Sequence, residues 1–103
     1  MRFKVCGDNW QVITVKPIDT ILRRSDGTRS MAVTDGKTKT VYLANNIPAD
    51  KLEKVLAHEI CHVICFVNRI YLPIEEEERI AGFVSEYGRE IRRIVDLLSA
   101  VLL

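Results

Sequence analysis

The chain has 103 residues, which suffices for one modest hydrophobic core and therefore predicts a single domain, residues 1–103. Its net charge of +1 gives no reason to expect nucleic acid or an anionic membrane as the main partner. Three cysteines, an odd number, argue against a disulfide framework. The first residues carry charges where a signal peptide needs an apolar run, so we expect a cytoplasmic protein.

The first 45 residues predict β-structure joined by turns. Segments 2–6 and 10–15 alternate polar and apolar side chains around the turn Gly7-Asp8-Asn9, a pattern typical of a β-hairpin. Segment 18–24 fits either a short strand or one or two helical turns. Two more strands are expected at 31–34 and 40–43, on either side of a turn at Asp35-Gly36.

Two helices are expected in the remainder. The first begins at Ala49, after a proline that suits a helix start, and ends near Asn68, because Tyr71-Leu72-Pro73 interrupts its pattern. The second begins near Ile74 and has an apolar stripe of 3.6-residue period. These elements predict an α+β fold. We expect a small N-terminal antiparallel or mixed sheet packed on the first helix, followed by a long C-terminal helix.

The first helix carries the sequence His58-Glu59-Ile60-Cys61-His62, which contains the only two histidines of the chain. Residues four apart lie on one face of a helix, so both imidazoles can bind one metal ion while Glu59 lies beside them. In zinc peptidases with this HExxH motif, the glutamate is the general base toward a metal-activated water. Two core histidines satisfied by hydrogen bonds are the alternative, which leaves the position of Glu59 unexplained.

A catalytic zinc ion takes three protein ligands, so the third has to be a carboxylate or a thiolate. Four glutamates, residues 75–78, open the second helix, which can fold back onto the first. Glu77 shares the helical face of the apolar stripe and is the first choice, with Glu76 at the other margin as the second. Glu75 and Glu78 are expected to point toward solvent. Some of the four glutamates complement the helix dipole.

Cysteine is a further possible ligand. Cys65 lies one turn beyond His62, on about the same side of the helix, so thiolate ligation is an alternative to a glutamate. Packing as a small apolar side chain is the favoured interpretation of Cys65, and Cys61 is expected in the core.

Together these residues resemble the small HExxH metallopeptidases of the ImmA/IrrE type, especially the compact versions common in phage and prophage genomes. The resemblance covers residues 10–91 and rests on the sheet, on segment 55–62 and on the glutamate-led helix with Ile80-Ala81-Gly82-Phe83-Val84. It implies a zinc site of His58, His62 and Glu77, with Glu59 as general base. Relatives act on phage-type repressors or related regulators. The chain departs from the larger members in lacking an N-terminal helix or an appended module.

We therefore expect a zinc-dependent peptidase whose partner is a protein or peptide substrate. Tyr71, Tyr87 or a nearby arginine would supply a second donor to the oxyanion. The substrate backbone would add as a strand to an exposed sheet edge, for which segment 40–43 is the best choice. The competing class is an inert or latent metal-binding module that binds a regulator without cleaving it.

The final segment, Leu97–Leu103, is apolar nearly all round. Such a segment suits burial in a core, which is the first expectation, or burial against a second copy of the chain. The sequence thus predicts either a monomer or a homodimer.

Overall fold

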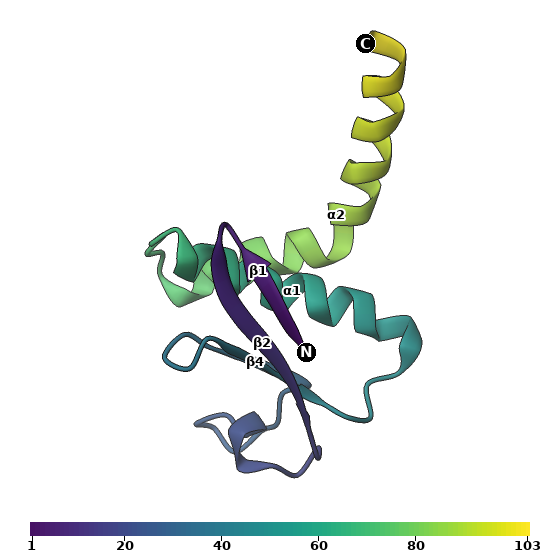
Figure 1. Ribbon diagram of the computed structural model, residues 1–103. Helices are drawn as coiled ribbons and strands as arrows, with labels where there is room; N and C mark the ends of the chain where they lie inside the picture. The colour runs from purple at the N-terminus through teal and green to yellow at the C-terminus, as the bar shows by residue number, and fades with distance from the viewer.

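The computed structural model describes residues 1–103 and confirms the expected α+β architecture. A four-stranded sheet is followed by two helices, of which the second is the longer (Figure 1). The elements are β1 (Arg2–Val5), β2 (Asp8–Val15), a short 3₁₀ helix (Thr20–Leu22), β3 (Ala32–Asp35), β4 (Thr40–Ala44), α1 (Ala49–Val67) and α2 (Ile74–Leu102).

The sheet is mixed, with the strand order β1-β2-β4-β3. β1 and β2 form the expected antiparallel hairpin, β2 and β4 are parallel, and β3 and β4 are antiparallel. The expectation that segment 40–43 is an exposed edge is therefore wrong, because β4 pairs on both sides. After β2 the chain crosses to the opposite edge of the sheet, where β3 lies. β4 then pairs between β3 and β2. The free edges belong to β1 and β3.

The core lies between the sheet and α1. Trp10, Val41 and Leu43 from the strands meet Val63 of α1, and none of the four is more than 6% exposed. Further side chains of α1 at helical spacing pack on this cluster, namely Val55, Leu56, Ile60 and Val67. Burial of this face holds α1 against the sheet, so the histidine-bearing helix has a fixed place in the molecule.

The end of α1 is formed by backbone geometry. Arg69 has a positive φ of 54°, and the N–H of Ile70 donates to the carbonyl of Cys65 at 2.8 Å. This left-handed residue after the helix is the usual way in which a helix stops and its last carbonyls are satisfied. The chain then reverses over a few residues, and α2 starts after Pro73 alongside the last turns of α1.

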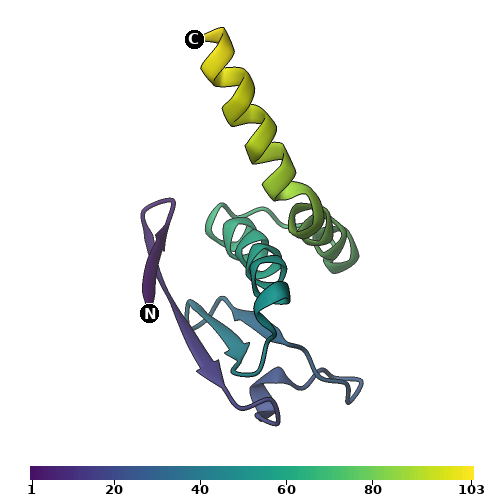
Figure 2. The same cartoon turned by 90° about the vertical axis from the view of Figure 1, so that its right-hand side faces the viewer.

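α2 packs on α1 with its first half and then bends away from the rest of the fold (Figure 2). Along α2, the last ion pair to α1 is that of Arg89 with Glu53, at 3.0 Å. Every residue from Ile91 onward is exposed, including all of Leu97–Leu103, so the expectation that this segment packs in the core is wrong. Beyond Arg89, which pairs with the second turn of α1, no element covers the helix. None of the helices combines the length and apolar character that a membrane span requires.

Gly36, in the turn between β3 and β4, lies directly under the ring of Phe66. A Cβ at this position would come within 2.3 Å of the ring, which itself contacts Trp10 edge-on at 5.8 Å between centroids. Any side chain larger than hydrogen must displace Phe66, so the close approach of this turn to α1 requires glycine here.

We expect Gly36→Ala to lower the free energy of unfolding by about 1 to 3 kcal/mol, because the added methyl overpacks the contact with Phe66. Gly82→Ala is the matched control: the new Cβ meets nothing within 4 Å, and alanine favours the helix. Urea denaturation followed by circular dichroism measures both. Equal stability of the two variants would contradict the close packing of Gly36 under Phe66.

Candidate metal centre

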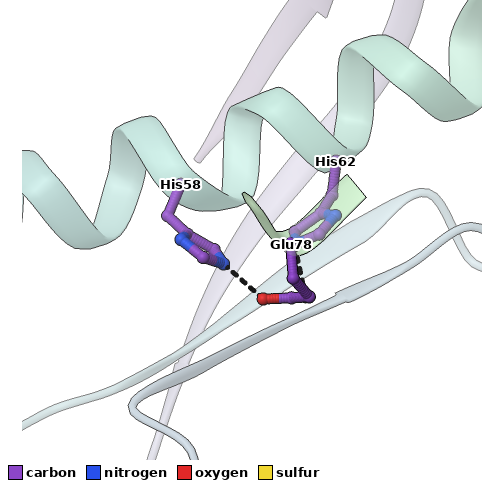
Figure 3. Close-up of side chains that lie close together, drawn as sticks. All are labelled: His58, His62 and Glu78. Atoms are coloured by element: carbon purple, nitrogen blue, oxygen red, sulfur yellow. Dashed lines mark hydrogen bonds and ion pairs between the residues drawn. The ribbon is translucent and has the colours of Figure 1, made fainter. Parts of the chain in front are cut away.

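Two histidines from α1 and one glutamate from the first turns of α2 converge at the surface between the helices (Figure 3). The Nε2 atom of His58 lies 3.0 Å from Oε2 of Glu78, and Nε2 of His62 lies 2.9 Å from Oε1 of the same carboxylate. One potential ligand atom from each residue lies within 4.8 Å of the other two. His58, His62 and Glu78 could therefore hold a metal ion.

The spacing of these atoms fits a small divalent cation. In a tetrahedral zinc site with bonds of 2.0 to 2.2 Å, ligand atoms lie about 3.3 to 3.5 Å apart. The observed imidazole–carboxylate separations of 2.9 and 3.0 Å need only a small outward movement to reach that value. Glu78 is half exposed and His58 is 29% exposed, so one side of the group is open to solvent. Two imidazoles and one carboxylate are also a donor set that suits zinc.

The position of Glu77 on the helical face predicted it as the third ligand, whereas the structure brings Glu78 to the two Nε2 atoms. Glu77 does face inward as expected, and its side chain is only 18% exposed. Its Oε1 lies 3.0 Å from Nδ1 of His62, the ring nitrogen that faces away from the metal group. The two histidines and Glu78 meet at the solvent-exposed margin of the helix pair, away from the apolar stripe of α2. The more exposed of the two glutamates, Glu78, therefore reaches the histidines. Glu75 and Glu76 are exposed and make no side-chain hydrogen bond or ion pair.

A carboxylate on Nδ1 fixes a metal-binding histidine. When Nδ1 carries the ring hydrogen and donates it to Glu77, the lone pair of Nε2 is directed at the metal position. His58 has no such partner for its Nδ1 within the protein. The two histidines are therefore held differently, and His62 is the more constrained of the pair.

Glu59 lies beside this group and is buried, with 7% of its surface exposed. Burial raises the pKa of its carboxyl, against the opposing effect of His62 and His58 and of the hydrogen bond from Thr34. The Thr34 hydroxyl lies 3.2 Å from Oε1 of Glu59 and 3.3 Å from its backbone carbonyl. Thr34 thus ties β3 to α1 at the motif. Thr34 was not expected in the site, because a threonine at an inward strand position next to a turn is equally typical of ordinary packing.

The site opens into a cleft of about 510 Å³ between β3, α1 and the start of α2. The cleft is lined by His58, Glu59, His62, Glu77 and Glu78, and by Thr34 and Tyr71 among others. Of the two tyrosines expected to donate to an oxyanion, Tyr71 lies in this cleft, while Tyr87 does not and instead contacts Phe83. The one arginine that lines the cleft is Arg24, from the loop before β3.

Neither cysteine of α1 belongs to the metal group. Cys61 and Cys65 are buried, as expected for core residues. Burial raises the pKa of the Cys61 thiol to about 11, and burial together with the carboxylate of Glu77 raises that of Cys65. Both thiols therefore stay protonated at neutral pH, a form that binds metals poorly.

Comparison with known proteins gives no function for the chain, so a functional assignment depends on the residues of the site. The chain matches no protein-family model, no curated protein and no solved structure. The resemblance to ImmA/IrrE-type peptidases thus stays a prediction from the sequence.

We expect Glu77→Ala to weaken zinc binding about 10- to 100-fold, because His62 loses the carboxylate that orients it. Glu78→Ala should remove binding under the same conditions, and Glu76→Ala, at an exposed neighbouring glutamate, should leave it unchanged. Competition with a chromophoric chelator measures all three affinities. If Glu77→Ala lost zinc binding as completely as Glu78→Ala, Glu77 would instead be a direct ligand.

Proposed function

We propose that this chain is a zinc-dependent peptidase in which His58, His62 and Glu78 bind the metal and Glu59 is the general base. The observation that carries this proposal is the position of Glu59, a buried carboxylate next to a three-residue ligand group at the floor of an open cleft. A structural metal site needs three or four ligands but has no use for a buried, unligated carboxylate of this kind.

A zinc ion held there would supply Lewis acidity and bring the pKa of a water molecule near neutrality. The protein supplies the proton transfer. The raised pKa of Glu59 moves it toward the range in which one group can both accept a proton from water and return it to a leaving amine. The hydroxyl of Thr34 holds Oε1 of Glu59 in place, which leaves Oε2 for the water.

The substrate is proposed to be an extended peptide that adds to the free edge of β3, in place of the interior strand β4. Met31 accepts a hydrogen bond from the N–H of Ala44, so the alternation of an antiparallel pair turns the N–H groups of Ala32 and Thr34 outward. Ala32, Val33 and Thr34 all line the cleft. A peptide paired with this edge would pass directly beside Glu59.

The natural substrate is proposed to be a regulatory protein, as the resemblance to ImmA/IrrE-type peptidases implies. The hydroxyl of Tyr71 is the proposed second donor to the oxyanion, since this side chain lines the cleft and is 84% exposed.

The decisive comparison is between Glu59→Gln and Glu78→Ala. We expect near-stoichiometric zinc by mass spectrometry in the wild type and in Glu59→Gln, and little zinc in Glu78→Ala. Hydrolysis of fluorescein-labelled denatured casein should fall about 10²- to 10⁴-fold in Glu59→Gln, the usual contribution of a general base. Zinc binding without any hydrolysis by the wild type would favour the alternative, a metal-binding module that does not cleave its partner.

A proline in β3 tests the substrate edge. Ala32→Pro removes an outward N–H without removing a bond of the sheet, so we expect a higher KM with zinc content and stability little changed. Val33→Pro is the contrasting variant, because the N–H of Val33 faces β4 and its loss should destabilise the fold. An unchanged KM in folded Ala32→Pro would exclude pairing at this position.

A further inference from the structure

The two ends of the cleft differ in chemistry. Near the start of β3 it is lined by Arg24 and Ser30, and a second hollow continues past His58 at the same end. Near the end of β3, where Gly36 meets Phe66, the lining is apolar and includes Ile70 and Leu72. Arg24, Ser30 and Glu59 line both hollows, whereas Phe66, Ile70 and Leu72 line only the first, so the apolar end is the one away from the second hollow.

Arg24 forms no ion pair, although its charge contributes to the lowered pKa of Asp26 in the same loop. Its Nε donates to the hydroxyl of Ser30 at 2.7 Å, which orients the side chain, and no carboxylate lies within 4.0 Å of the guanidinium. Of the four arginines of α2, Arg89, Arg92 and Arg93 are each paired with a carboxylate, and Arg79 is not. The terminal nitrogens of Arg24 are therefore free to bind a carboxylate in the two-pronged geometry that guanidinium groups favour.

The apolar end is open to solvent. Phe66 is 48% exposed although its ring packs over Gly36, and Ile70 is 44% exposed. Together with Leu72 they form a surface that a large apolar side chain of a bound peptide would cover.

The middle of the cleft would reject an acidic side chain. Glu59, Glu77 and Glu78 gather there, and a single divalent cation offsets only part of their negative charge. A carboxylate on the substrate is thus accommodated at the Arg24 end alone.

Resting on the proposed peptidase function, we propose that this cleft selects peptides that place a carboxylate at Arg24, on one side of the scissile bond, and a large apolar side chain at Phe66 and Ile70, on the other. The carboxylate is either an Asp or Glu side chain or the C-terminus of the peptide, since Arg24 binds both in the same way.

The test is a mixture of synthetic unstructured peptides in which Asp, Lys, Ser, Phe and Leu are paired at every separation from one to six residues. Cleavage sites are identified by mass spectrometry, with each peptide present as a free acid and as an amide. We expect the zinc-loaded wild type to cut between an acidic and a large apolar residue. Cleavage of the free acids alone would assign the carboxylate to the peptide terminus.

Charge reversal supplies the control. Arg24→Glu should reduce kcat/KM for acidic peptides roughly five- to tenfold, the effect expected of an exposed ion pair and its reversal, and favour lysine at that position. Arg29→Glu makes the same change of charge in the same loop but outside the cleft, and should retain the acidic preference. Cleavage without acidic preference, or with the same preference in Arg24→Glu, would overturn the inference while leaving the peptidase proposal intact.

Binding separates the two proposals when nothing is cleaved. The probe is a fluorescein-labelled peptide with one Asp and one Phe, titrated by anisotropy into zinc-loaded Glu59→Gln, beside a Lys-for-Asp peptide. Tighter binding of the acidic peptide that Arg24→Glu abolishes would support the cleft chemistry even for an inactive protein. Equal binding of both peptides would reject it.

Discussion

The burial of one face of α1 against the sheet is the contact on which the other features of the molecule depend. Trp10, Val41 and Leu43 close around Val63, next to His62 in the chain. Because side chains on a helix turn by about 100° per residue, fixing Val63 in the core also fixes the direction of its neighbours. His58 and His62 then face the cleft, and Glu59 lies at the boundary between core and cleft, where its carboxylate is buried yet touches the site.

This boundary position has a cost for the metal-free protein. Burial disfavours the charged form of Glu59, and one hydrogen bond from Thr34 together with two imidazoles offsets the penalty only in part, since the pKa remains raised. Functional sites commonly retain groups that a purely structural core would exclude. Thr34 matters here because it is the only side chain that donates to this carboxylate, and it comes from a strand far from the motif in sequence.

Much of the fold could be predicted from local patterns. Alternation identified the strands, helical periodicity together with Pro48 and Pro73 located both helices, and the four-residue spacing placed the two histidines on one face. Strand order could not be predicted in this way, because nothing in segment 40–43 shows that the chain returns between β2 and β3. An apolar run such as Leu97–Leu103 has the same pattern whether it is buried or projects into solvent.

The third member of the metal group shows the limit of helical-face reasoning most clearly. The helical face correctly predicted that Glu77 points inward. Which ring nitrogen of His62 a glutamate contacts depends, however, on the length of its side chain and on the angle between the two helices. One residue further along, Glu78 is more exposed than Glu77, yet its carboxylate lies within 3.0 Å of both Nε2 atoms. Thr34 carried no signal of its own, since a threonine on an inward strand position is ordinary packing.

The chain reverses direction between α1 and α2, and this reversal determines how a bound cation would affect stability. The ligands of the site lie on both sides of the short segment that joins the helices, so a cation bound to His62 and Glu78 would act as a cross-link that closes a loop of 16 residues. Closing a loop of this size restricts the unfolded chain by an amount comparable to a disulfide, about 3 kcal/mol in the chain-entropy description. In a chain whose three cysteines are all free, a bound cation would act in place of a covalent cross-link, and the stability of the contact between α2 and α1 would depend on the supply of that cation.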